Sequence, residues 1–291
     1  PTCTISGNPT TWTTSATLIA AVSDNVAVTG YAWSNSAATP STYTTINTAS
    51  TNLTKTITTN QIIYMHIKDA AGNTASCSAN VEYLDSGTCT APTIMGSVAN
   101  NTWATSNTIT ITGGNCASGV NHYVYCVSTT GSSSSNCTDW SNTYEEALNY
   151  NTNGTYYIFA RAVSNSKPND TGEGNGIGTF TVRIDKDTPA APTITGTTAS
   201  GSWATSNTLT ISGSSSTSGI QKYEYCDSTS ESSCTGTWNT YTSSMKYNTC
   251  GKKYVFARAI NNVPTTGTVS SPYKVFILPT TPTITASNSD G

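Results

Sequence analysis

The amino-acid sequence predicts an all-β protein made of three tandem β-sandwich domains in an elongated array. Three observations support this prediction: short segments alternate apolar and polar residues, glycine- and asparagine-rich turns separate them, and long motifs return about 100 residues later. No segment shows the 3.6-residue apolar spacing of an amphipathic helix. Strands joined by turns therefore account for the whole chain.

The internal repeat defines the predicted domains. Ala91–Ile94 returns as Ala191–Ile194, and Trp103–Thr108 returns as Trp203–Thr208. A more divergent first copy keeps only a short part of these motifs, beginning at Trp12. The predicted domains are residues 1–90, 91–189 and 190–279, and residues 280–291 are interpreted as the start of a truncated fourth copy.

The strands are clearest in the second copy. Residues 108–112, 120–126 and 156–163 alternate with period two, and Gly113-Gly114 and Asn153-Gly154 supply turns between such segments. About seven short strands, with turn signals every 8 to 12 residues, are typical of an immunoglobulin-like sandwich.

Several motifs resemble the bacterial immunoglobulin-like repeats found in tandem in surface and adhesin-type proteins. Asp69–Asn73 is similar to that family's turn after a late strand, Ser118–Tyr125 and Ser218–Tyr225 are similar to its third strand, and Arg183–Pro189 is similar to its repeat junction. The second and third copies lack the Ala-Gly-Asn part of the turn. The resemblance implies a scaffold, and it implies no catalytic activity.

Composition narrows the class of protein. Charged residues make up 9% of the chain and the net charge is −3, so no basic surface for nucleic acid or for an anionic membrane is expected. The nine cysteines lack the spacing of metal sites, which favours disulfides in an extracellular or cell-surface location. No cofactor-binding pattern is present, and we expect no cofactor.

The cysteine positions predict four disulfides and one cysteine left over. Two short-range disulfides are predicted because their cysteines recur in the second and third copies. The disulfide that spans most of the first copy is predicted because the first and last strands of such sandwiches lie beside each other. The predicted pairs are Cys3–Cys77, Cys89–Cys116, Cys126–Cys137 and Cys226–Cys234. Cys250 remains, and we expect it to bond to a following repeat or to another chain. A free buried thiol is the alternative.

In the second and third copies, alternation along the sixth predicted strand places aromatic and arginine side chains in an exposed row. Such a row suits the binding of a sugar or a protein partner. In the alternative, two excursions cover this row. Each excursion is the segment that a short-range disulfide closes, together with the tryptophan that follows it, Trp140 or Trp238. The residues of the predicted row are Tyr157, Phe159, Arg161, Tyr254, Phe256 and Arg258.

Residues for catalysis or metal binding are scarce. His66 and His122 lie in different copies, and we expect both to point outward into solvent. Asp185 and Asp187 flank the second junction and are weak candidates for calcium, but the first junction offers only Asp85, so this feature is not expected to repeat. We therefore predict no catalytic residue and no metal.

The expected function is that of a non-catalytic stalk or spacer of a bacterial surface protein, which resists proteolysis and extension or adheres directly. One alternative is a polymerising filament or virion-fibre subunit, and another is a carbohydrate-binding accessory module. The protein or glycan partner is unknown, self-association is possible, and we expect neither nucleic-acid binding nor membrane insertion.

Overall fold

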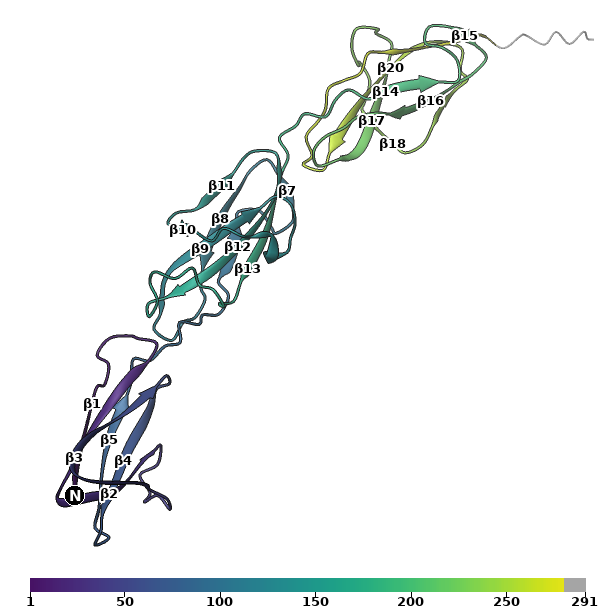
Figure 1. Cartoon of the computed structure of the whole chain (residues 1–291). Coiled ribbons are helices and arrows are strands. Elements are labelled where there is room, and N and C mark those ends of the chain that lie inside the picture. Colours follow the sequence, from purple (N-terminus) through teal and green to yellow (C-terminus); the bar gives the residue numbers. More distant parts are fainter. Residues whose placement is uncertain (280–291) are drawn as a thin grey trace, which may run out of the picture. The chain divides into compact units, whose positions relative to one another are not determined.

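The computed structural model describes residues 1–279 and confirms the all-β class. Figure 1 shows three sets of strands along the chain, and the truncated fourth copy lies outside the described residues. Contacts between residues group the described residues into two compact units. The first comprises residues 1–95, 109–148 and 157–180, and the second comprises residues 96–108, 149–156 and 181–279. No helix among the described residues is long and apolar enough to cross a membrane.

The first sandwich is one hydrogen-bonded sheet that folds back on itself. The strands follow the order β1-β2-β4-β5, with β3 also paired to β2. β1 and β5 nevertheless contact each other, and a disulfide joins them, so the two ends of the sheet close around the core. The strands are β1 (Thr2–Ser6), β2 (Ala16–Ser34), β3 (Thr44–Ile57), β4 (Gln61–Asp69) and β5 (Thr74–Val81).

The second sandwich consists of two sheets, with the orders β10-β9-β12-β13-β7 and β11-β8-β6. β9, β12 and β13 lie side by side in Figure 1. The elements are β6 (Thr93–Gly96), β7 (Trp103–Ala104), β8 (Asn107–Thr112), β9 (Val120–Ser128), the short helix η1 (Ser134–Asn136), β10 (Asn142–Tyr144), β11 (Leu148–Tyr150), β12 (Gly154–Ser164) and β13 (Gly178–Ile184).

The third sandwich has the same arrangement, with the orders β15-β21-β20-β17-β18 and β14-β16-β19. The strands are β14 (Thr193–Gly196), β15 (Trp203–Ala204), β16 (Asn207–Ser212), β17 (Ile220–Ser228), β18 (Asn239–Tyr241), β19 (Met245–Tyr247), β20 (Gly251–Asn261) and β21 (Tyr273–Ile277). The predicted boundaries at residues 90 and 189 fall between β5 and β6 and between β13 and β14.

Alternation in the sequence places the apolar residues inside. Along β8, Ile109 and Ile111 are buried while the intervening threonine is partly exposed, and Leu209 and Ile211 repeat this pattern in β16. β12 and β20 differ, because they are buried along most of their length, which shows that both of their faces are covered. The covering of their outer faces determines how the candidate site is built.

Candidate functional site

A buried carboxylate follows the last strand of the first sandwich. Asp85 is 3% exposed, and its backbone N–H donates to the carbonyl oxygen of Thr13 at 2.9 Å. Its Oδ2 accepts hydrogen bonds from the N–H and hydroxyl of Ser118, at 3.0 and 2.6 Å, and from the hydroxyl of Ser164 at 2.6 Å. Its Oδ1 accepts from the N–H of Gly87 at 2.9 Å. The side chain of Asp85 is thus bonded to the second sandwich, at Ser118 in the loop before β9 and at Ser164 at the end of β12.

Asp185 occupies the equivalent place after the second sandwich and is fully buried, with 0% exposure. Its Oδ2 accepts hydrogen bonds from the hydroxyl of Ser216 at 2.6 Å, the N–H of Ser218 at 2.8 Å and the amide of Asn261 at 3.2 Å. Its Oδ1 accepts from the N–H of Asp187 at 2.8 Å. We call Asp85 and Asp185, each with its donors, the two junction cages.

The aspartate pair of the second junction does not repeat, as expected, because Gly87 stands where the second junction has Asp187. A single buried aspartate that accepts hydrogen bonds does repeat, and the interpretation of these residues as metal ligands missed it. Asp85 and Asp185, like Ser118 and Ser218, are separated by 100 positions in the printed sequence, so the repeat itself contained the signal. The hydroxyl donors differ between the cages. Ser216 donates in the second cage, whereas its counterpart in the first is Cys116, which forms a disulfide. Each cage lies wholly inside one compact unit.

The first cage holds its carboxylate ionised. Burial raises the pKa of Asp85, but hydrogen bonds from Ser118, Ser164 and Gly87 outweigh burial and lower the pKa from 3.8 to about 2. In the second cage burial likewise raises the pKa of Asp185, and the bonds from Ser216 and Ser218 lower it below its ordinary value.

The Asp85 cage is expected to make stability depend on pH in acid. Because the pKa is lower in the folded state, its contribution is complete above about pH 4 and is lost as the pH falls toward 2, a loss of roughly 2 kcal/mol. Urea unfolding between pH 2 and 6 measures it, and Asp85→Asn should show a correspondingly smaller decrease. An equal decrease in both proteins would contradict this assignment.

The junction carboxylates are surrounded by hydrogen-bond donors rather than by further cation ligands. Asp187 accepts from the amide of Asn153 at 2.6 Å and from the hydroxyl of Thr217 at 2.6 Å. Calcium needs six or more oxygen ligands. In residues 1–279 no group of three or more His, Cys, Asp or Glu side chains could hold a metal ion. Hydrogen bonding therefore accounts for the surroundings of Asp185 and Asp187.

The predicted exposed row is wrong for its central residues. Phe159 is 1% exposed and Phe256 3%, because the disulfide-closed excursions fold over β12 and β20. Phe159 packs with the Cys126–Cys137 disulfide, and Trp140 and Tyr157 pack against this cluster. The covering alternative is therefore the one that the structure shows.

Each arginine of the row stacks on the tryptophan of its excursion. The guanidinium carbon of Arg161 lies 3.8 Å from the ring centroid of Trp140, and that of Arg258 lies 4.2 Å from that of Trp238. Both arginines are half-buried, as is Tyr254. Burial lowers the pKa of Arg161, with Glu173 and Asp170 opposing that effect through space. Cation–π stacking thus fixes the covers over the two sheets.

The cysteines form the four pairs that the spacing predicts: Cys3–Cys77, Cys89–Cys116, Cys126–Cys137 and Cys226–Cys234. Cys250 is unpaired and exposed, so the buried-thiol alternative is wrong. When the strands that begin at Gly154 and Gly251 are aligned, Asn153 stands where the third sandwich has Cys250. Asn153 binds the following linker, because its Oδ1 accepts from the N–H of Lys186 at 2.7 Å.

The two histidines lie in different sandwiches, as expected, but the expectation that His66 points into solvent is wrong. It is 4% exposed, and its Nε2 lies 3.0 Å from the carbonyl oxygen of Ser36, because the segment after β2 covers that side of β4. His122 is half-buried on β9, with Nδ1 2.9 Å from the side-chain oxygen of Asn121.

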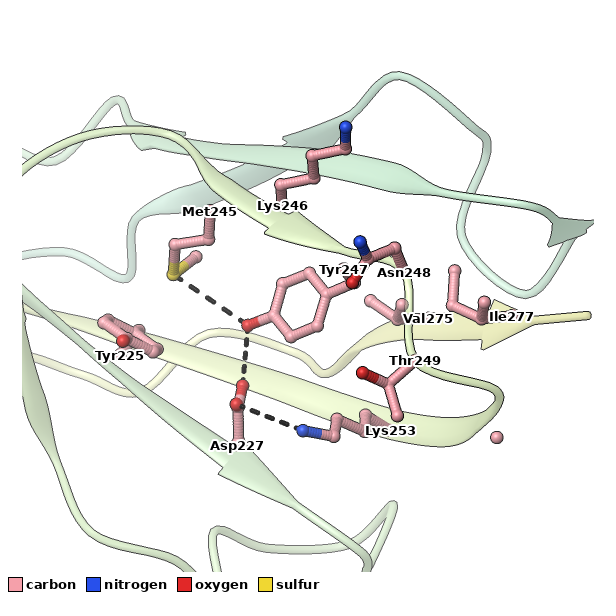
Figure 2. A pocket seen from close by; sticks show the side chains of 11 residues that line it. Tyr225, Asp227, Met245, Lys246, Tyr247, Asn248, Thr249, Lys253, Val275 and Ile277 are labelled. Carbon is pink, nitrogen blue, oxygen red and sulfur yellow. Dashed lines mark hydrogen bonds and ion pairs between the residues drawn. The ribbon is translucent and has the colours of Figure 1, made fainter. Parts of the chain in front are cut away.

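A cavity of about 370 Å³ opens between the sheets of the third sandwich. Figure 2 shows the Tyr247 hydroxyl between the Asp227 carboxylate and the Met245 sulfur, with Lys253 reaching toward Asp227. Tyr247 donates to Asp227 Oδ1 at 2.6 Å, and Lys253 Nζ lies 3.7 Å from Oδ2. Burial, followed by the bond to Asp227, raises the pKa of Tyr247 far above its ordinary value. These polar groups bond to one another, and the tyrosine stays protonated.

Comparisons with known proteins leave the family open. No protein-family model matches the sequence, and no curated protein matches it. Among solved structures, the chain is similar to the three N-terminal domains of the bacteriophage RB49 Highly Immunogenic Outer Capsid protein (Hoc), with 11% identity, a TM-score of 0.38, and 95% of this chain and 98% of that chain covered.

The chain is also similar to the FN1–FN3 domains of chicken CNTN1, with 11% identity, a TM-score of 0.25, and 94% of this chain and 96% of that chain covered. At these TM-scores neither likeness supports an argument about function. The assignment of the chain as a tandem array of immunoglobulin-like β-sandwiches rests on its own strands and sheets.

Proposed function

We propose that this chain is a non-catalytic extracellular spacer, the repeat region of a surface protein, in which each linker is fixed to the sandwich that follows it. The observation that carries the proposal is the repeated junction cage. In both cages a linker aspartate is buried, and its carboxylate accepts at least four hydrogen bonds. Four disulfides support an oxidising, extracellular location.

The backbone of the cage residues supports the same function. The N–H of Asp85 bonds to Thr13 and that of Asp185 bonds to the carbonyl oxygen of Ala104 at 2.9 Å, so each residue is bonded to the sandwich before it. Its side chain is bonded to a loop and to the end of a strand of the sandwich after it. A residue bonded in both directions limits the bending of a short linker, which is what a spacer requires.

Loss of the first cage is expected to broaden the distribution of distances across the first junction. Spin labels at the exposed positions Thr56 and Thr179, in a Cys250→Ser background, report that distance by pulsed electron resonance. Asp85→Ala should widen the distribution, because the donors of Ser118 and Ser164 lose their acceptor.

Asp139→Ala is the matched control. The Asp139 carboxylate is exposed and accepts hydrogen bonds from its near neighbour Ser141, from the N–H at 2.9 Å and from the side chain. It should leave the distribution unchanged. An unchanged width in Asp85→Ala would overturn the proposed coupling, whereas equal broadening in both variants would show that the effect does not come from the cage.

A second candidate function is that of a filament or fibre subunit joined through Cys250. The exposure of this thiol favours it, because an exposed cysteine can reach a cysteine of another chain. Oxidised wild-type protein should then form disulfide-linked dimers on a non-reducing gel, and Cys250→Ser should abolish them. Wild-type protein that stays monomeric under oxidising conditions would exclude this function for the chain.

A further inference from the structure

In the second sandwich the ring of Tyr156 packs into a cradle formed by the end of β11, the start of β12 and the turn between them. Its centroid lies 4.9 Å from that of the Tyr150 ring, and its hydroxyl donates to the carbonyl oxygen of Thr152 at 3.1 Å. A side-chain carbon added at Gly154 would lie 3.5 Å from Cε2 and Cζ of Tyr156, so the ring also covers this glycine. We call Tyr150, Thr152 and Gly154 the ring cradle.

The third sandwich keeps the ring cradle but not the ring. When the two sandwiches are aligned at the first residues of β12 and β20, the cradle residues return as Tyr247, Thr249 and Gly251. The two aligned glycines have φ of 149° and 135°, a region that favours glycine, so the turn keeps its backbone conformation. Lys253, which carries no ring, stands where the second sandwich has Tyr156.

The cavity of about 370 Å³ lies at this second copy of the cradle. Its lining includes all three cradle residues, and Figure 2 shows the side chains of Tyr247 and Thr249 among those that line it. A side-chain carbon added at Gly251 would have no heavy atom of the described residues within 4 Å, apart from its chain neighbours. The volume is at the lower end of the range for small-ligand sites, which suits a single ring.

The polar groups at the cavity hold its aromatic wall and leave its opening free. Tyr247 donates its hydroxyl to Asp227 Oδ1 at 2.6 Å, which fixes the orientation of its ring. Lys253 lines the cavity without filling it, because its side chain is 49% exposed and its ammonium reaches toward Asp227. This ion pair is long, 3.7 Å, and open to solvent, so Lys253 can move aside at little cost.

We propose that this cavity of the third sandwich binds a phenol ring that comes from outside the chain. The ring of the ligand packs against Tyr247 and over Gly251, and its hydroxyl donates to the carbonyl oxygen of Thr249, as that of Tyr156 does in the second sandwich. A tyrosine side chain of a partner protein and a free phenol share this chemistry. The site goes beyond the spacer function, because a spacer needs no ligand.

The methionine methyl groups report binding. The chain has three, those of Met65, Met95 and Met245, so their proton–carbon correlation spectrum is simple and can be assigned with single leucine variants. Met245 lines the cavity, whereas Met65 is fully buried in the first sandwich and Met95 is 51% exposed in the second. Titrating the full chain with 4-methylphenol should move the Met245 signal saturably. The Met65 signal should stay in place, and the exposed Met95 is the internal control for nonspecific effects of the ring.

A second set of titrations tests the hydroxyl and the source of the ring. The ether 4-methylanisole keeps the ring but cannot donate a hydrogen bond, so it should bind at least about fivefold more weakly than 4-methylphenol. N-acetyltyrosinamide stands for a tyrosine of a partner protein. A saturable Met245 shift with this amide would assign the site to a protein partner, whereas a shift with 4-methylphenol alone would assign it to a free phenol.

Lys253→Tyr supplies the ring from the chain itself, as the second sandwich does. It should shift the Met245 signal without ligand and abolish saturable binding of 4-methylphenol. Lys252→Tyr is the matched control, because it adds the same ring at the neighbouring exposed position, which faces the other side of β20. This control should leave the affinity unchanged. The comparison of ligands on the wild-type chain keeps the test valid if Lys253→Tyr fails to fold.

Three outcomes would overturn the proposal. The first is the absence of a saturable Met245 shift with 4-methylphenol. The second is equal affinity for 4-methylanisole, which would show that the hydroxyl is not recognised. The third is undiminished binding in a folded Lys253→Tyr variant, which would place the ligand outside the cradle.

Discussion

Replacing both Cys3 and Cys77 with serine is expected to lower the free energy of unfolding of the first sandwich by about 4.5 kcal/mol. This bond spans 74 positions and joins β1 to β5, the two ends of the folded sheet. Without it, the unfolded chain gains the entropy that the long closed loop had removed. Hydrogen exchange read by mass spectrometry measures the loss separately for each sandwich, and protection should decrease in β1 and β5 first.

The Cys226–Cys234 bond provides the comparison, because it spans only 8 positions. Its removal should cost the third sandwich about 2.5 kcal/mol in the same chain-entropy model. The difference between the two losses tests the physical origin of the effect. A larger loss from the short bond than from the long one would show that packing under Trp238, rather than loop closure, determines the contribution.

Asp185→Ala is expected to destabilise the third sandwich by about 3 kcal/mol, even though Asp185 follows the second. The substitution removes the acceptor of the half-buried Ser216 hydroxyl and of the buried Ser218 N–H, and it removes one of the three acceptors of the buried Asn261 amide. Asn261 is 0% exposed, so water cannot replace the lost bond without a local opening. Hydrogen exchange in β20, which ends at Asn261, should therefore accelerate.

Asp185→Asn separates charge from shape, since it keeps an acceptor oxygen and the size of the side chain. It should cost less than Asp185→Ala, and Asp139→Ala, at an exposed carboxylate, should change stability by less than about 0.5 kcal/mol. Unchanged exchange in β20 of Asp185→Ala would show that the cage does not stabilise the sandwich to which it is bonded.

Local pattern was sufficient for the strands and the disulfides. Alternating residues fix which side of a strand faces the core, and the predicted alternation of residues 108–112 is the pattern in which Ile109 and Ile111 are buried. Cysteines that recur in two copies, or that lie at the two ends of one sandwich, have few possible partners. The folding of β1 onto β5 follows from the same argument that paired Cys3 with Cys77.

Alternation could not show what covers the outer face of a sheet. Phe159 and Phe256 have the outward parity that the sequence predicts, but the excursions that carry Trp140 and Trp238 bury them. His66 is buried for the same reason, by a segment that lies far from it in the sequence. Such coverings are made by irregular segments, whose path no periodic pattern encodes.

The junction cages lie between these two cases. The donors from the following sandwich to Asp85, Ser118 and Ser164, are 33 and 79 positions away from it, a distance over which no local rule pairs residues. The 100-residue repeat nevertheless contains both aspartates and both serines. Comparing the copies position by position, instead of searching each junction for metal ligands, would have found them.

The direction of the end segments has a consequence for how such an array carries load. In all three sandwiches a short segment near the beginning runs parallel to the closing segment: Thr13 with Leu84, β7 with β13, and β15 with β21. Tension on the two ends of one sandwich therefore acts along these paired segments, so their hydrogen bonds are strained in shear and must rupture together. Asp85 and Asp185 come directly after these pairings, which places each cage at the point where tension would pass from one sandwich to the next.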